Sequence, residues 1–272
     1  MLGHSARADG IFDWNANELR YWYGPNFHQP GVGDAAGKAV DIPKNIVSLT
    51  HADGYAWGTN FVNVDFLKST SADPANNSTN GAFEVYAVYR HDLSLGKTVD
   101  AKAFSFGPVR DVMIEAGGDL NYKNDTFVSL KRLALAGLAF DIDIPGFWKV
   151  ALLWGKEFIY NGVTKRNVTF DSTPHFETAW AYPFQIASRN VNFEGFGLVT
   201  LPKGRDGFGN QSRTEILLHP KLMMDIGDLF GDPKRLWAGF GYEYWHNKFG
   251  NNEQEVAGAS QNAFFVELAL HF

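Results

Sequence analysis

"NAFFVELALHF", residues 262–272, is the stretch of this sequence that decides the fold class. Counted back in steps of two from the end, every residue is large and apolar: Phe272, Leu270, Leu268, Val266 and Phe264. The residues between them are mixed: His271, Ala269, Glu267 and Phe265. A period of two is that of a β-strand, whose side chains point alternately to opposite faces. The stretch is therefore a strand with one apolar face, and the rest of the chain must show what that face meets.

The same alternation recurs along the chain, whereas helical periodicity is scarce. Segments of strand type lie near 16–24, 44–52, 57–67, 82–91, 110–121, 132–144, 147–160, 174–186, 192–201, 213–223, 234–247 and 261–272. Between them lie turn-rich stretches such as "STSADPANNSTNG" (69–81), built from residues that tolerate tight or left-handed backbone. We therefore expect one all-β domain of about twelve strands over residues 1–272, with residues 1–13 poorly ordered.

The two faces of these segments differ in charge. In 175–184 one face carries Phe176, Thr178, Trp180, Tyr182 and Phe184, and the other carries His175, Glu177, Ala179 and Ala181. The same contrast holds in the other segments: apolar faces carry almost no charge, and the opposite faces combine carboxylates with glycine and alanine. Lys156 is an exception on an apolar face, and near a strand end its long stem can carry the charge toward water.

Two architectures fit this pattern. A soluble β-sandwich or barrel would turn the apolar faces inward. Three features favour a membrane barrel instead: strands of the length that crosses a bilayer, Tyr and Trp near the ends of the apolar faces, and small residues on the opposite faces. We predict a transmembrane antiparallel β-barrel of a bacterial outer membrane, with short periplasmic turns and longer extracellular loops.

Composition excludes several functions. The net charge is −6 and the chain has no cysteine, which argues against nucleic-acid binding, disulfides and thiolate metal sites. The eight histidines show no metal-ligand spacing, so we expect no metal and no cofactor. An outer-membrane lipid hydrolase needs a lipid-facing Ser–His pair. His51 near Ser48 and Thr50 is only a chance-level match, so we expect no enzyme and no catalytic residues.

Three stretches point to a family. They are "FGPVRDVMIEAGGDLNY" at 106–122, "GLAFDIDIPGFWKVALLWGKEFIYNG" at 137–162 and "YWYGPNF" at 21–27. They resemble the nucleoside-specific outer-membrane channel (Tsx) family, which shows an "FGP" opening a strand, a "GLGTDID" segment before an aromatic-rich strand, and an "RFGP" segment near its N-terminus. Trp22–Tyr23 stands where the family has Arg–Phe, and Ala116–Gly117 stands where it has an Asn pair.

The resemblance implies a monomeric twelve-stranded barrel with a narrow pore through which nucleosides diffuse. It also implies that the closing strand, which ends at Phe272, is read by the barrel-assembly machinery. Alternatives remain open: a channel for another small solute such as a sugar or a hydrophobic compound, a soluble β-barrel binding protein, or a lipid hydrolase. An acid-rich lumen argues against anionic solutes.

A nucleoside track in a lumen needs aromatic faces for stacking and polar groups for base edges and ribose. The aromatic candidates are Tyr23, Tyr86, Trp237, Trp245 and Phe265. The polar candidates are Asn63, Asp65, Glu84, Arg90, Asp111, Glu115, Asp119, Asp141, Asp143, His175, Glu177, Arg235, Glu243 and Glu267. Tyr23 is the first choice because motif and chemistry coincide there, although a change of parity near Gly24–Pro25 would turn Tyr21 or Trp22 inward instead. The alternative role for each candidate is a space-filling aromatic or a structural ion pair.

Overall fold

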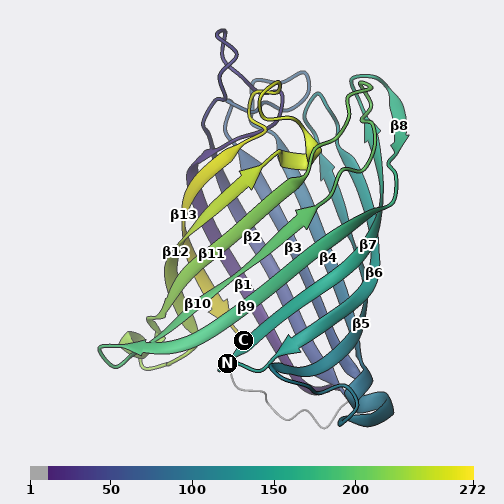
Figure 1. Cartoon of the computed structure of the whole chain (residues 1–272). Helices are drawn as coiled ribbons and strands as arrows, with labels where there is room; N and C mark the ends of the chain where they lie inside the picture. The colour runs from purple at the N-terminus through teal and green to yellow at the C-terminus, as the bar shows by residue number, and fades with distance from the viewer. Residues whose placement is uncertain (1–11) are drawn as a thin grey trace.

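A computed structural model describes residues 12–272, which form a closed antiparallel β-barrel (Figure 1). The wall consists of twelve strands: β1 (Phe12–Phe27), β2 (Ile42–Tyr55), β3 (Gly58–Ser69), β4 (Phe83–Ser94), β5 (Val109–Lys123), β6 (Leu130–Ile142), β7 (Phe147–Asn161), β9 (Thr173–Ile186), β10 (Arg189–Thr200), β11 (Glu215–Asp225), β12 (Leu236–His246) and β13 (Gln261–His271). A short strand, β8 (Arg166–Thr169), continues the pairing along β7 beyond the start of β9. The predicted fold class is confirmed. The poor order expected for 1–13 falls on undescribed residues, except that Phe12 and Asp13 lie in β1.

The C-terminal strand closes the barrel, which answers why it is apolar to its end. β13 pairs with β12 on one side and with β1 on the other, and the register places Leu268 opposite Tyr21 and Val266 opposite Tyr23. Every second residue of β13 is exposed on the outer face, while Ala263 and Phe265 are buried inside. A barrel has no free sheet edge only when its first and last strands pair in this way.

The outer face of the wall is the apolar one. Trp154 on β7 and Phe240 on β12 point outward and are 59% and 60% exposed, whereas the lumen-facing Glu115 on β5 is 0% exposed. A soluble barrel would show the reverse arrangement. An apolar belt around a closed barrel with a charged interior is the structure of an outer-membrane β-barrel. The protein is therefore an integral protein of a bacterial outer membrane.

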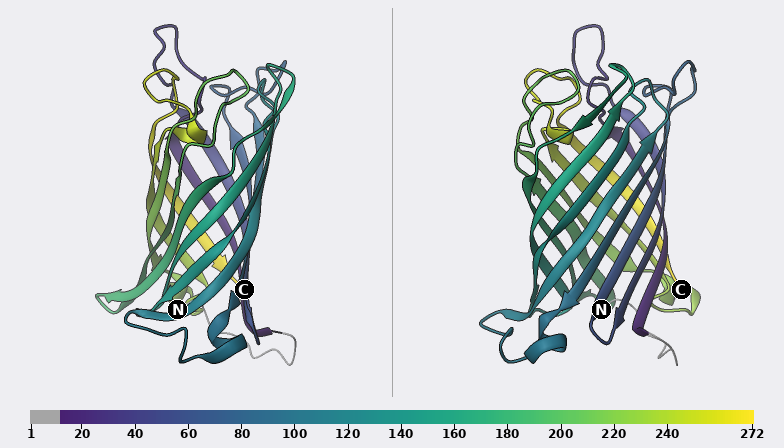
Figure 2. Two further views of the ribbon diagram at one scale, coloured as in Figure 1. Left: turned by 45° about the vertical axis from the view of Figure 1, so that its right-hand side comes forward. Right: turned by 90° about the vertical axis from the view of Figure 1, so that its right-hand side faces the viewer.

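The two ends of the barrel differ, as Figures 1 and 2 show. Phe12, the first described residue, and Phe272 lie at one rim, where β2–β3 and β9–β10 are joined by two residues each. Ala187 and Ser188 in the second of these turns both take positive φ, as a tight hairpin requires. Loops such as 28–41, 70–82 and 247–260 form the opposite rim. Long extracellular loops and short periplasmic turns are thus confirmed, with 95–108 and 226–235 as two longer periplasmic connections.

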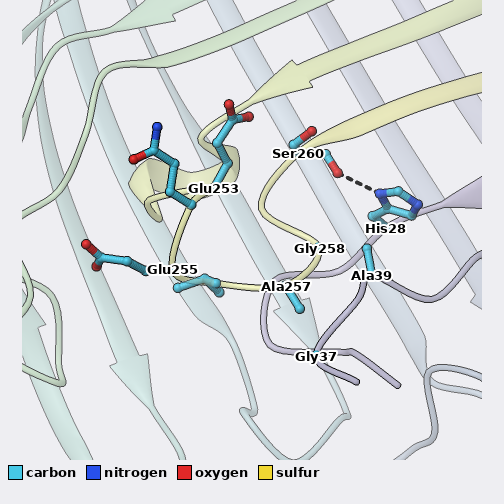
Figure 3. Close-up of a pocket in the computed structure, with 10 residues that line it drawn as sticks. His28, Gly37, Ala39, Glu253, Glu255, Ala257, Gly258 and Ser260 are labelled. Carbon is cyan, nitrogen blue, oxygen red and sulfur yellow. Dashed lines mark hydrogen bonds between the residues drawn. The ribbon is translucent and has the colours of Figure 1, made fainter. Parts of the chain in front are cut away.

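Short helical segments interrupt the connections: η1 (Gly96–Asp100), η2 (Gly227–Phe230) and η3 (Lys248–Gly250). None of the helical segments in the described part of the chain is long and apolar enough to cross a membrane. On the extracellular side, the loops 28–41 and 247–260 fold against each other around a polar pocket (Figure 3). There, His28 Nδ1 lies 2.6 Å from the backbone carbonyl of Ser260, which ties the two loops together.

Candidate functional site in the barrel lumen

An arginine spans part of the lumen at mid-height. Arg90 on β4 donates hydrogen bonds from Nε and Nη2 to the two carboxylate oxygens of Glu177 on β9, at 2.9 and 2.8 Å. Its Nη1 donates to Asp119 on β5 at 2.9 Å, and its Nε lies 3.5 Å from Glu115. We call these four residues the Arg90 cluster. Because β5, β6 and β7 separate β4 from β9, the cluster bridges over three strands of the wall.

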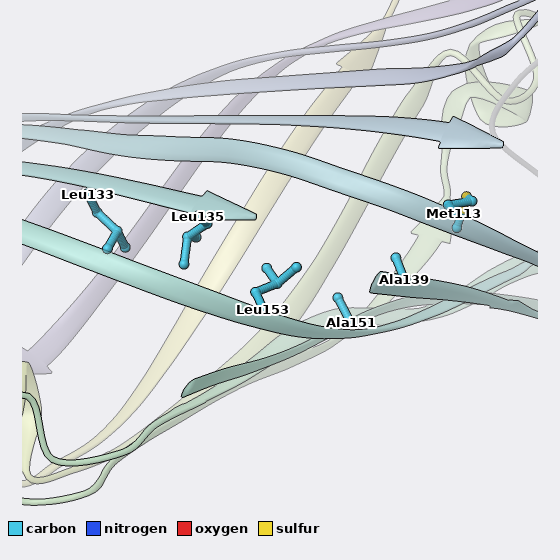
Figure 4. Close-up of a cluster of buried hydrophobic side chains, with 6 residues drawn as sticks. All are labelled: Met113, Leu133, Leu135, Ala139, Ala151 and Leu153. Carbon is cyan, nitrogen blue, oxygen red and sulfur yellow. The ribbon is translucent and has the colours of Figure 1, made fainter. Parts of the chain in front are cut away.

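Buried apolar side chains lie on the inner face of the three strands that the Arg90 cluster bridges. Six buried residues of β5, β6 and β7 form this group (Figure 4): Met113, Leu133, Leu135, Ala139, Ala151 and Leu153. Gly117 on β5 is needed for the bridge, because a Cβ there would lie 2.9 Å from Cδ of Arg90 and 2.2 Å from the carbonyl oxygen of Tyr89. This side of the lumen is therefore packed.

Lysines extend the network on the same side. Lys149 on β7 lies 2.9 Å from both Asp92 and Glu115. Lys131 on β6 donates to the hydroxyl of Tyr86 at 2.9 Å and lies 3.6 Å from Asp119. Buried charges persist only when they are paired and hydrogen-bonded, and each of these carboxylates has a cation beside it.

Aromatic packing fills the opposite side of the lumen toward the extracellular end. The buried cluster there consists of Trp22, Phe27, Ile46, Ala263 and Phe265. His219 on β11 lies against it, with its ring stacked 4.6 Å from Phe265 and its Nδ1 3.0 Å from a carboxylate oxygen of Glu243. Gly241 leaves room for the Phe265 ring, since a Cβ there would lie 2.1 Å from it.

A second ion cluster lies below these aromatics. Lys221 on β11 lies 2.6 Å from Glu267 on β13 and 3.2 Å from Glu194 on β10. Arg20 on β1 pairs with Glu18 and lies 3.7 Å from Glu267. Arg20 and Glu194 remain half-buried, so they face the water that enters the lumen.

Two aromatic rings stay accessible inside the barrel. Phe61 on β3 and Phe196 on β10 point inward and are 38% and 41% exposed. Five strands separate β3 from β10 in either direction: β4, β5, β6, β7 and β9 one way, and β2, β1, β13, β12 and β11 the other. The two rings therefore lie on opposed walls. Half-buried polar side chains accompany Phe61 on its wall: Thr50, Asn63 and Asp65. These side chains belong to the accessible part of the inner face, between the two packed sides of the lumen.

Most predicted lumen residues do face inward. The alternation of burial and the strand registers place on the inner face Asn63, Asp65, Glu84, Tyr86, Arg90, Asp111, Glu115, Asp119, Asp141, His175, Glu177, Trp237, Glu243, Trp245, Phe265 and Glu267. Many of them form hydrogen bonds or ion pairs with other residues of the barrel. Asp111 accepts hydrogen bonds from Ser94 and the backbone of Gly96 at the periplasmic rim, and Trp245 donates to Glu215. Their contact with a solute remains a prediction.

Three predicted positions are wrong. Tyr23 lies on the outer face and is 36% exposed there, while Trp22 points into the lumen, so the alternative parity holds. Arg235 precedes β12 and pairs with Asp232 in an exposed periplasmic connection. Asp143 follows β6 in a periplasmic turn and lies 3.4 Å from Arg110. Both charges lie at the rim because β6 ends at Ile142 and β12 begins only at Leu236, so each strand is shorter than alternation predicted.

The accessible rings Phe61 and Phe196 were missed, although the sequence carried a signal for both. Asn63 and Asp65 were placed inward, and Phe61 has the same parity on the same strand. Glu194 fixes the inner face of β10, and Phe196 is two residues further along that face. A charge on an alternating strand thus identifies its aromatic neighbours as lumenal.

His51 lies on the outer face and does not form a hydrolase site. Its Nδ1 lies 2.7 Å from Oδ1 of Asn17 and its Nε2 lies 3.2 Å from Oδ2 of Asp53. Ser48 points into the lumen instead, where its Oγ accepts a hydrogen bond from Trp22. Among the described residues, no group of three or more His, Asp or Glu side chains is placed to hold a metal ion.

The fold and the lumen together define a channel-like outer-membrane β-barrel. Among solved structures, the chain is similar to the KdgM porin (9% identity, TM-score 0.45, covering 94% of this chain and 99% of that one) and to the NanC porin (8% identity, TM-score 0.48, 94% and 99%). It is also similar to the translocator domain of the autotransporter NalP from Neisseria meningitidis (10% identity, TM-score 0.45, 95% and 88%). No protein-family model and no curated protein sequence matches the chain. The resemblance to the nucleoside-specific channel family therefore stays a prediction.

Proposed function

We propose that the protein is a diffusion channel for small, flat solutes without negative charge, and that nucleosides are its substrates. The observation that carries the proposal is the pair of accessible rings, Phe61 and Phe196, on opposed walls of a lumen that holds a buried apolar cluster on each of its other two sides. Stacking on an aromatic ring contributes about 1–3 kcal/mol per base and tolerates any base. Such weak contacts orient a base without trapping it, as conduction requires.

The polar groups beside the rings suit the rest of a nucleoside. Thr50 Oγ1 donates to Asn63 Oδ1 at 2.7 Å, and Asn63 Nδ2 donates to Asp65 at 2.8 Å. This line of hydroxyl, amide and carboxylate groups offers donors and acceptors to ribose and base edges. Carboxylates outnumber lysines and arginines on the inner face, so the lumen disfavours anionic solutes.

Single-channel current in planar bilayers tests the proposal. Adenosine should block the current transiently, and the double variant Phe61→Ala/Phe196→Ala should weaken that block roughly fivefold or more, as the loss of stacking implies. Tyr23→Ala is the matched control: it removes an aromatic ring from the outer face and should leave the block unchanged.

The same assay separates the rival solutes. Glucose and sialic acid are added under the conditions used for adenosine. The nucleoside assignment fails if adenosine leaves the current untouched while either of the others blocks it. It also fails if the double variant keeps the wild-type block.

A further inference from the structure

Two cations lie on the outer face of the wall, in its extracellular half. Arg132 is the third residue of β6, and Lys156 lies on β7. The register pairs Arg132 with Phe158 and Ala134 with Lys156, so Arg132 and Lys156 are diagonal neighbours on one face. The backbone positions of such neighbours are about 7–8 Å apart, within reach of long side chains. Their odd-numbered neighbours on both strands point into the lumen, where Glu157 pairs with Lys203 at 2.7 Å.

Neither Arg132 nor Lys156 has an ion pair or a side-chain hydrogen bond with any residue between 12 and 272. Lys68 on β3, an outer-face cation of the same extracellular half, differs because its ammonium donates to the carbonyl of Gly81. On the outer face of the described strands, the carboxylates are Asp13 and Asp53, both near the periplasmic end of β1 and β2. The protein therefore supplies no anion to Arg132 and Lys156.

An unmatched cation on the lipid face is unfavourable. The cost is about 2–4 kcal/mol at the bilayer midplane and falls to about 0–1 kcal/mol near the interface. Two such cations side by side also repel each other. Anionic headgroups of the surrounding membrane relieve both effects, and at this height the headgroups belong to the extracellular leaflet.

A flat strip leads from the cations toward the bilayer centre. Gly118 pairs with Ala134 and Ala116 pairs with Ala136 across β5 and β6, so small residues follow one another on the outer face. Tyr89 borders the strip opposite Gly118, and Trp154 borders it opposite Ala136. Both rings are exposed. The strip of small residues thus has an aromatic side chain on each side, and Lys156 borders it at Ala134, its extracellular end.

We propose that Arg132 and Lys156 bind the phosphate of an acylated glycolipid in the extracellular leaflet, with one acyl chain along the strip of small residues below them. Guanidinium and ammonium groups match a phosphate in charge and in hydrogen bonding. The strip is uncharged and made of small residues, which suits a hydrocarbon chain. The site is on the opposite side of the wall from the lumen, so it does not rest on the channel function.

Lipid A binding to the purified full chain in detergent, measured by native mass spectrometry, tests the site. Arg132→Gln/Lys156→Gln should weaken binding about tenfold per cation removed (about 1.4 kcal/mol each). Arg132→Lys/Lys156→Arg should keep most of the affinity because it keeps both charges. Lys68→Gln is the control and should bind as the wild type does. The heat-dependent gel shift of a folded barrel checks that each variant is folded.

Two competitors distinguish the source of the phosphate. Millimolar inorganic phosphate should displace lipid A poorly, because it carries the charge but no acyl chain. Phosphatidylglycerol in the same detergent carries both, but it offers one phosphate to the two cations where lipid A offers two, so it should displace lipid A only when present in large excess. Unchanged lipid A affinity in the double Gln variant would overturn the proposal. An equal loss in Lys68→Gln, full displacement by inorganic phosphate, or full displacement by an equimolar amount of phosphatidylglycerol would also overturn it.

Discussion

Replacing Arg90 by methionine tests the packing of the lumen most sharply. Arg90 is 7% exposed and contacts three carboxylates, of which Glu115 is fully buried. Methionine has similar length but no charge, so Glu115, Asp119 and Glu177 lose their shared cation. Removing one partner of a buried ion pair costs about 3–5 kcal/mol. For a protein of this size that corresponds to a fall in unfolding temperature on the order of 10 °C.

The same change should open the lumen. Without the bridge to Glu177, the carboxylate and the methionine side chain can separate, and water enters beside the apolar group of β5–β7. Single-channel conductance in planar bilayers should therefore rise, and the cation preference should increase because net negative charge in the lumen grows.

Arg110→Met is the matched control. Arg110 is exposed and lies 3.6 Å from Asp141 and 3.4 Å from Asp143 at the periplasmic rim, so its loss should cost less than about 1 kcal/mol. The reasoning is refuted if both variants unfold at the same temperature, or if Arg90→Met unfolds earlier but conducts as the wild type does.

Two further predictions concern charge. Glu177→Gln/Glu194→Gln removes two half-buried lumenal carboxylates, so the reversal potential in a KCl gradient should move toward zero; an unchanged potential would place the selectivity elsewhere. Burial, with Lys44 nearby, lowers the pKa of Lys248 in the extracellular loop from its usual 10.5 to about 7. The unfolded chain thus holds this proton up to a higher pH than the folded barrel, and stability should rise between pH 7 and 10.5. Lys248→Met should remove that part of the rise in unfolding temperature, and a variant with the wild-type pH dependence would contradict the assignment.

Alternation was sufficient to predict the barrel and the inner face of most strands. β13 shows why: five large apolar residues at a spacing of two leave one choice for the lipid face. The aromatic residues alone mislead at Tyr23, since Tyr21, Trp22 and Tyr23 are neighbours of one kind. The charges of Glu18 and Arg20 mark the parity of Trp22 as lumenal, and the register with β2 and β13 agrees.

The contacts across the lumen could not be predicted. Arg90 and Glu177 are 87 residues apart and lie on strands that are not neighbours, so their pairing depends on the curvature of the whole wall. Whether a lumenal residue is packed or open depends on the same geometry. Trp237 and Phe265 are buried, whereas Phe196 on the same inner face is open. Sequence alternation gives the face of a side chain, and closure of the barrel determines its neighbours.

The absence of cysteine allows a direct test of whether solutes pass Phe196 inside the barrel, because a single cysteine can be introduced at any chosen position. A charged, water-soluble methanethiosulfonate applied to Phe196→Cys should reduce the single-channel current stepwise. The same reagent should leave Phe193→Cys unaffected, since position 193 belongs to the lipid face of the same strand. A current that falls for Phe193→Cys and stays constant for Phe196→Cys would contradict the account.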